Sequence, residues 1–258
     1  MAPSRKHAFM KVFHYGHAIV GFEGALDATK QQVADFIHNV TSLKQPDETT
    51  VDEDTGKIIN SGGYEIDKSL LSEQPERYQN LRSAGISRQD IEFLDLLDET
   101  MAKCFVEYVD LFPVAQDSVE WRTNGYLIKY GKGQSMGPHS DSAIPKIVSN
   151  ENRDDSMSRL APIMNTLTAG IILNDDYDGG ELHFRQWGVT PRTPALSAVI
   201  YPSAFSGCHE VFPITSGFRY AFLCWYGQGP GGGYQLPMPA IQRRSDVRRI
   251  DVGYQKIL

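Results

Sequence analysis

The run YLIKYGKGQSMGPHSD, residues 126–141, joins an apolar segment to two polar side chains that suit a metal ion. Its first half, Tyr126–Tyr130, is rich in β-forming residues and lies between Gly125 and Gly131, a composition typical of a strand. Its second half ends on His139-Ser140-Asp141. In an extended segment the side chains of residues i and i+2 point to the same face, so this imidazole and this carboxylate can approach one ion together.

A third ligand is available further along the chain, in Cys208-His209-Glu210. Two imidazole nitrogens and one carboxylate oxygen on one face of an octahedral ion leave three positions open, which suits iron(II) that binds a bidentate co-substrate and then dioxygen. A structural zinc site would instead be closed by four ligands, usually including cysteine. A single histidine is more often an ordinary surface or core residue, so the prediction rests on His139, Asp141 and His209 as a set.

Ten residues after His209, Arg219 opens the apolar run RYAFLCWY, residues 219–226. A run this apolar is not a solvent-facing edge, so the guanidinium is at least partly enclosed and needs a partner. A ligand carboxylate would supply one through a bidentate pair, and a salt bridge to a distant acid is the alternative. The period of two predicts that Trp225 lies on the same face as Arg219.

Short β-rich runs with turn signals between them predict an antiparallel sandwich or barrel in the second half of the chain. The runs are Leu167–Leu173, Glu181–Phe184 after the Gly179-Gly180 turn, Ala195–Tyr201 and Arg219–Tyr226. Residues 142–165 interrupt this pattern and are rich in Ser, Asn, Asp and Arg. A loop this long inside a compact domain is uncommon and often functional, so we expect a substrate-selecting lid there, with a solvated insertion as the alternative.

The first 120 residues are expected to form strands followed by helices. The expected strands are Ala8–Met10 and His17–Val20, the expected helices are 27–43 and 87–111, and 44–65 reads as a surface loop with one strand. Helical spacing of apolar residues supports both helices. Asp27 is the predicted N-cap of the first, and Ser87, followed by Gln89, Asp90 and Glu92, opens the second.

The composition of the chain excludes several function classes. With 258 residues, a formal charge of −7 and a pI near 5.5, the chain has no general attraction for nucleic acid. The basic stretch Arg243–Arg249 is more typical of a solvated tail than of a polyanion site. Three sparse cysteines argue against a disulfide framework and a zinc ribbon. Since we find neither a signal peptide nor an apolar run as long as a membrane span, we expect a cytoplasmic protein without a membrane partner.

Together these motifs resemble the prolyl 4-hydroxylase-like branch of the 2-oxoglutarate- and iron(II)-dependent dioxygenases. The matching segments are YLIKYGKGQSMGPHSD at 126–141, GIILNDDYDGGELHF at 170–184 and residues 195–226 with HEVFPITSGFRYAFLCWY. The resemblance implies a mainly β fold with flanking helices, the double-stranded β-helix or jelly roll. It implies one oxygenase domain over 1–258, with N-terminal strands and supporting helices in 1–120, the catalytic core in 121–226 and an extension in 227–258.

The resemblance also implies roles for individual residues. His139, Asp141 and His209 would bind iron(II), Arg219 would pair with the distal carboxylate of 2-oxoglutarate, and Tyr130 would lie near this co-substrate, with ascorbate as a stimulant of turnover. The family carries an aromatic residue where this chain has Ile171 or Ile172. Its hydroxyl contact to the co-substrate is therefore missing there, and Thr168 or Tyr126 is the candidate replacement.

The implied reaction is hydroxylation of an unactivated C–H bond in a small molecule, an amino acid or a peptidyl residue, with succinate and carbon dioxide as co-products. A peptidyl or protein prolyl hydroxylase is the alternative within this class. A halogenase is disfavoured because Asp141 is present, and a nucleic-acid demethylase because its second arginine motif is absent. A non-catalytic cupin-like binding module would use a different ligand pattern. The substrate itself and the oligomeric state stay open.

Overall fold

Two facing antiparallel sheets form the body of the protein. The computed structural model describes residues 10–43, 62–66, 87–119, 121–123, 125–141, 146–147, 162–228 and 235–236. The centre of the larger sheet has the strand order β5 (Gly125–Tyr130), β14 (Arg219–Gln228), β8 (Pro162–Ile172) and β11 (Ser197–Pro202). It is extended by β2 (Val20–Glu23) and β1 (Lys11–His14) beyond β11, by β3 (Gly62–Ile66) beyond β5, by β4 (Trp121–Thr123) and β15 (Gln235–Leu236) beside the end of β14, and by β7 (Lys146–Ile147) beside the start of β8.

The smaller sheet covers one face of the larger one. It consists of β10 (Leu182–His183), β12 (His209–Val211) and β6 (Met136–His139), with β13 (Ile214–Ser216) paired to β9 (Asp178–Gly179) below it. From β5 to β14 the chain therefore alternates between the two sheets. This alternation is the double-stranded β-helix, and the fold class predicted from the sequence is confirmed.

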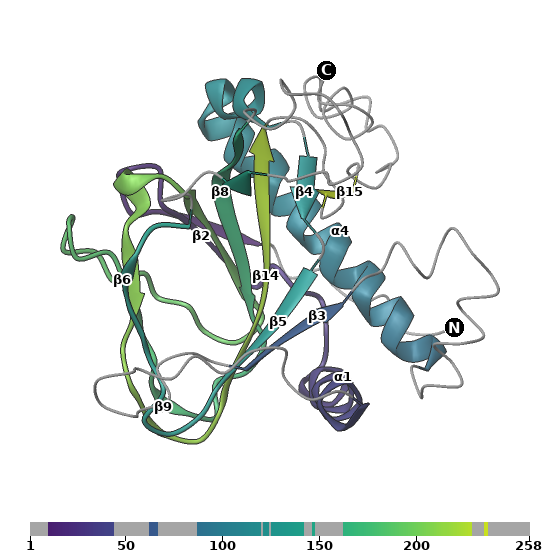
Figure 1. Ribbon diagram of the computed structural model, residues 1–258. Coiled ribbons are helices and arrows are strands. Elements are labelled where there is room, and N and C mark those ends of the chain that lie inside the picture. Colours follow the sequence, from purple (N-terminus) through teal and green to yellow (C-terminus); the bar gives the residue numbers. More distant parts are fainter. Residues whose placement is uncertain are drawn as a thin grey trace.

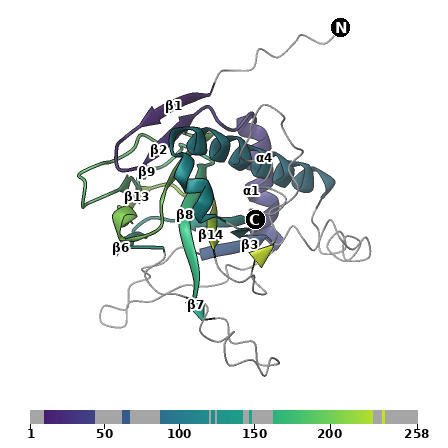
Figure 2. The ribbon, with the colours of Figure 1, turned by 90° about the horizontal axis from the view of Figure 1, so that it is seen from above.

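Each face of the larger sheet has its own apolar core. The face toward the smaller sheet packs residues such as Tyr130, Phe184, Val199 and Val211. The opposite face packs against the helices α1 (Lys30–Leu43) and α4 (Arg88–Leu111), and η1 (Pro113–Ser118) follows α4. Figure 1 shows α4 on the side of β14 and β8 that faces away from β6. Viewed from above, α1 lies beside α4 (Figure 2).

Helix α4 begins where the sequence predicts. Ser87 is its N-cap, and a capping box with Asp90 satisfies two backbone N–H groups of the first turn. Two contacts anchor its second half to the sheet. The Phe105 ring stacks on Tyr226 of β14 with centroids 4.4 Å apart, and the Tyr108 hydroxyl donates a hydrogen bond of 2.9 Å to the carbonyl of Ala18.

Two local predictions in the N-terminal part are wrong. Helix α1 is capped by Thr29 and not by Asp27, because Thr29 and Gln32 exchange the two hydrogen bonds of a capping box. The segment His17–Val20 is not a strand. His17 and Ala18 have φ values of 53° and 58° and form a tight turn, so the strands are β1 before the turn and β2 after it.

Several predictions fall outside the described residues. The proposed lid at 142–165 is described only at Lys146–Ile147 and from Pro162 onward, where the chain forms β7 and the start of β8 and not a loop. The basic stretch near residues 243–249 is not covered, and the strand predicted at Ala8–Met10 is covered only at Met10, which precedes β1. Within the described part of the chain, no helix has the length and apolar character to cross a membrane.

Phe105→Ala tests how far α4 stabilises the fold. The side chain is 1% exposed, so its removal loses apolar burial and leaves a cavity under β14. We expect a loss of about 3–5 kcal/mol in the free energy of unfolding, measured by urea titration. Glu107→Ala, at an exposed position of the same helix, should change the free energy by less than about 0.5 kcal/mol. Equal effects of the two variants would contradict this packing.

Candidate metal centre

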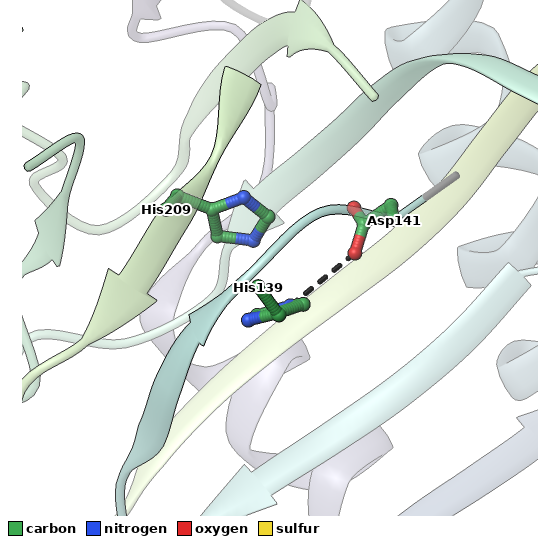
Figure 3. Close-up of side chains that lie close together, drawn as sticks. All are labelled: His139, Asp141 and His209. Atoms are coloured by element: carbon green, nitrogen blue, oxygen red, sulfur yellow. Dashed lines mark ion pairs between the residues drawn. The ribbon is translucent and has the colours of Figure 1, made fainter. Parts of the chain in front are cut away.

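The pairing of β6 with β12 brings the predicted ligands together. His139 and His209 are direct cross-strand partners, and their rings lie 4.3 Å apart. Asp141 follows β6 by two residues, and the ligand atoms of His139, Asp141 and His209 all lie within 4.8 Å of one another. Figure 3 shows the three side chains converging from β6, the turn after it and β12. One ion can therefore contact all three.

The backbone orients both imidazoles in the same way. His139 Nδ1 lies 2.8 Å from the carbonyl oxygen of Gly137, and His209 Nδ1 lies 2.9 Å from that of Gly207. A carbonyl only accepts, so Nδ1 carries a proton in each ring and Nε2 is the nitrogen left to face a metal ion. Metal-binding histidines commonly have this second hydrogen bond, which fixes the tautomer and the ring orientation.

The two carboxylate oxygens of Asp141 have different surroundings. Oδ2 accepts hydrogen bonds from the Thr168 hydroxyl at 2.5 Å and from the indole Nε1 of Trp225 at 3.1 Å. Oδ1 faces His139 Nε2 at 3.3 Å. Because protein donors occupy Oδ2, the arrangement favours Oδ1 as a single-oxygen metal ligand. It also confirms that Trp225 points to the interior of the barrel.

The pKa values of the three ligands are shifted in different directions. Burial alone would raise the pKa of Asp141, but the hydrogen bond from His139, the charge of His209 and the Thr168 hydroxyl outweigh it and lower the pKa to about 2. Burial lowers the pKa of His209. Burial also acts to lower the pKa of His139, but its hydrogen bonds with Asp141 and Gly137 prevail and the pKa is raised. The carboxylate is thus ionised at neutral pH, and His139 is the ligand that holds a proton more readily.

Arg219 lies at the other end of the interior, opposite Tyr130 on β5. It is 5% exposed, its guanidinium carbon lies 5.6 Å from the centre of the Tyr130 ring, and its Nε has no hydrogen-bond partner among the described residues. Gly180 approaches the arginine so closely that a Cβ there would lie 3.1 Å from Arg219 Cδ and 2.3 Å from Ile214 Cδ1. A buried donor of this kind fits a ligand carboxylate, as 2-oxoglutarate would provide.

The sequence did not single out Tyr201, whose hydroxyl contacts His209. Tyr201 lies on β11 beside Thr168 of β8, is 4% exposed, and its hydroxyl lies 3.2 Å from His209 Nε2. Burial first, and then the negative charge of Asp141, raise its pKa well above the usual range, so the hydroxyl stays protonated. The alternation of β11 would have pointed to it, because Val199 and Tyr201 share the inner face.

The expected replacements for the missing family aromatic behave differently. Thr168 faces the interior, but its proton goes to Asp141 and not to a space for a co-substrate. Ile171 belongs to the core beneath the helices. The side chain of Tyr126 lies outside the described part of the structure.

The turn before His209 is tightly constrained. Residues Phe205–Gly207 form η2, where a Cβ on Gly207 would lie 1.6 Å from the carbonyl oxygen of Pro202. The indole Nε1 of Trp187 donates a hydrogen bond of 2.6 Å to the carbonyl of Ser206. These contacts hold the Gly207 carbonyl in the position where it orients His209.

Comparison with known proteins supports the predicted resemblance over the barrel. Residues 125–227 match the sequence model of the 2OG-Fe(II) oxygenase superfamily. A PKHD-type hydroxylase from Xanthomonas campestris pv. campestris is 35% identical over 101 residues, and one from Paracoccus denitrificans is 31% identical over the same length. Each alignment covers 38% of this chain and 40% of the relative, so the match spans well under half the length of these relatives. Over this segment the resemblance to 2-oxoglutarate and iron(II) oxygenases is confirmed.

Similar solved structures include a viral collagen prolyl hydroxylase from Paramecium bursaria Chlorella virus-1 and a prolyl-4-hydroxylase from Pseudomonas putida. The TM-scores are 0.49 and 0.47, and the identities are 10% and 18%. The alignments cover 82% and 84% of this chain and 96% and 95% of those chains.

The unequal histidines predict how metal binding depends on pH. A metal ion must displace the proton of His139, whose pKa is raised, before that of His209, whose pKa is lowered. Affinity for cobalt(II), a divalent stand-in for iron(II), should fall as the pH decreases from 8 to 6. As the pH decreases, the plot of log Kd against pH should first approach a slope of minus one, where His139 takes up a proton, and steepen toward minus two only at lower pH, where His209 does so as well. Calorimetric titration over this range measures the slope, and a slope of zero throughout, or a single step to minus two, contradicts the assignment.

Proposed function

We propose that this protein is an iron(II)- and 2-oxoglutarate-dependent dioxygenase that hydroxylates an unactivated C–H bond, with residues 121–226 as its catalytic core. The observation that carries the proposal is the combination of two features in one barrel. His139, Asp141 and His209 converge within 4.8 Å, and the buried guanidinium of Arg219 has an Nε without a partner among the described residues. The first feature suits a metal with open coordination positions. The second suits the far carboxylate of a co-substrate whose other end binds that metal.

The residues of the chain would divide the work as follows. His139 Nε2, His209 Nε2 and Asp141 Oδ1 would hold iron(II), and Thr168 and Trp225 would keep the carboxylate in place. Arg219, supported by Tyr130, would hold the far carboxylate of 2-oxoglutarate. The bound iron, 2-oxoglutarate and dioxygen would supply the oxidising chemistry, which converts C–H to C–OH while 2-oxoglutarate becomes succinate and carbon dioxide.

The substrate class that we propose is a small molecule, an amino acid or a peptidyl residue. The name of the PKHD-type relatives supports a hydroxylase. A net charge of −7 disfavours nucleic acid as a substrate. Hydroxylation of a peptidyl proline is the second candidate, and the two differ in whether turnover requires a proline-containing peptide.

Succinate formation tests the proposed reaction. The purified protein with iron(II), 2-oxoglutarate and ascorbate should release succinate faster when its substrate is present, so panels of amino acids, proline-containing peptides and cell metabolites can be screened. Asp141→Ala should abolish turnover, and His139→Ala with His209→Ala should also abolish metal binding. A cupin-like binding module would bind metal without forming succinate, and unchanged activity in these variants would refute the site.

Arg219→Ala tests the co-substrate anchor separately from the metal. Removing one partner of an enclosed charge pair costs about 2–5 kcal/mol, so the Kd of 2-oxoglutarate should rise by about one to more than three orders of magnitude. Cobalt(II) should still bind, because among the described residues no hydrogen bond joins Arg219 to any of the three metal ligands. Arg192→Ala removes an arginine whose side chain is 80% exposed and should leave the Kd unchanged. An unchanged Kd in Arg219→Ala would refute the anchor.

A further inference from the structure

The hydroxyl of Tyr201 contacts the atom of His209 that would bind the metal. It lies 3.2 Å from His209 Nε2 in a buried position. Since Nδ1 of the same ring donates its proton to the Gly207 carbonyl, Nε2 carries a lone pair and Tyr201 donates to it. In the arrangement that the structure shows, the tyrosine therefore caps the metal-binding lone pair.

A metal ion and this hydrogen bond compete for one lone pair. When an ion occupies Nε2, the Tyr201 hydroxyl loses an acceptor while its surroundings stay buried. A buried donor without an acceptor destabilises that state. A new oxygen acceptor beside the ion would remove the penalty.

Tyr201 is placed where such an acceptor would arrive. Its ring lies 4.8 Å from the His209 ring and belongs to the same apolar cluster as Tyr130, whose ring centre lies 5.6 Å from the guanidinium carbon of Arg219. A co-substrate that reaches from the metal to Arg219 would pass this hydroxyl. Its oxygen atoms near the metal, from the carboxylate and the neighbouring keto group, are acceptors.

We propose that Tyr201 is a positioning residue that exchanges partners, donating to His209 Nε2 in the metal-free protein and to an oxygen of 2-oxoglutarate in the metal-loaded protein. This inference rests on the proposed function. It makes metal and co-substrate binding cooperative, because the co-substrate restores the hydrogen bond that the metal breaks. The Tyr201 hydroxyl therefore weakens binding of the metal alone and strengthens binding of the co-substrate.

Tyr201→Phe tests the exchange, since it removes the hydroxyl and keeps the ring. Calorimetry without oxygen should show cobalt(II) alone binding about 2- to 10-fold more tightly than in wild type, because no hydrogen bond competes for His209 Nε2. The Kd of 2-oxoglutarate for the cobalt-loaded protein should rise by a similar factor. The change in tryptophan fluorescence on loading offers a second readout, since one of the three tryptophans, Trp225, donates to Asp141.

A matched variant separates this role from general loss of a buried hydroxyl. Tyr108→Phe also removes a buried tyrosine hydroxyl, one that donates to the Ala18 carbonyl on the helix side of the sheet. It should leave both Kd values unchanged. If Tyr201→Phe weakens cobalt(II) binding, leaves both Kd values as in wild type, or behaves as Tyr108→Phe does, the exchange is refuted.

The same titrations distinguish this inference from the proposed function. Wild-type protein that binds neither cobalt(II) nor, once loaded, 2-oxoglutarate would refute the function. Wild-type protein that binds both, with a Tyr201→Phe variant that shows no opposite shifts, would refute only the exchange.

Discussion

The antiparallel pairing of β6 with β12 is the contact on which the candidate centre depends. It places His139 opposite His209, and a slip of one residue would turn one imidazole to the outside of the barrel. The strands are short, so their register needs support from the loops. The backbone of Gly133 donates to Ile214, and Ile214 donates to Gln134, which ties the turn before β6 to the chain that follows β12. The ligand geometry is thus supported by backbone contacts at the end of this small sheet where Met136 pairs with Val211.

The interior of the barrel holds one charged side chain at each end, and the two differ in their hydrogen-bond partners within the protein. The negative Asp141 is surrounded by donors from Thr168, Trp225 and His139, so most of its cost of burial is offset within the protein. The positive Arg219 is also buried, but its Nε lacks a partner among the described residues. An interior that is complete at its anionic end and incomplete at its cationic end is suited to a ligand with a carboxylate at the arginine and neutral or anionic oxygens at a metal.

The sequence predicted the features that depend on short-range patterns. Short β-rich runs bounded by turn signals located β5, β14 and the second half of β8, and the His-x-Asp spacing identified two ligands on one face. Alternation along β11 places Tyr201 on the inner face, but its contact with His209 arises from tertiary packing and no motif marks it. The prediction of Asp27 as an N-cap is wrong because Thr29 forms a capping box with Gln32 and lies closer to the helix. The sequence analysis missed the turn at His17 because residue type alone does not show which non-glycine residues adopt the left-handed backbone conformation.

Strand β14 connects the candidate metal centre on one face of the larger sheet to α4, a helix of 24 residues, on the other face. Its outer face presents Phe222, Cys224 and Tyr226 to the helix-side core, while its inner face carries Arg219 and Trp225. Because the two faces belong to one backbone, packing of α4 on Tyr226 also restricts Trp225 and, through it, Asp141. Groups that must meet a ligand within a fraction of an ångström work best on rigid elements. The helix side of the sheet therefore acts as the support that keeps the arginine end and the metal end of the interior at a fixed separation.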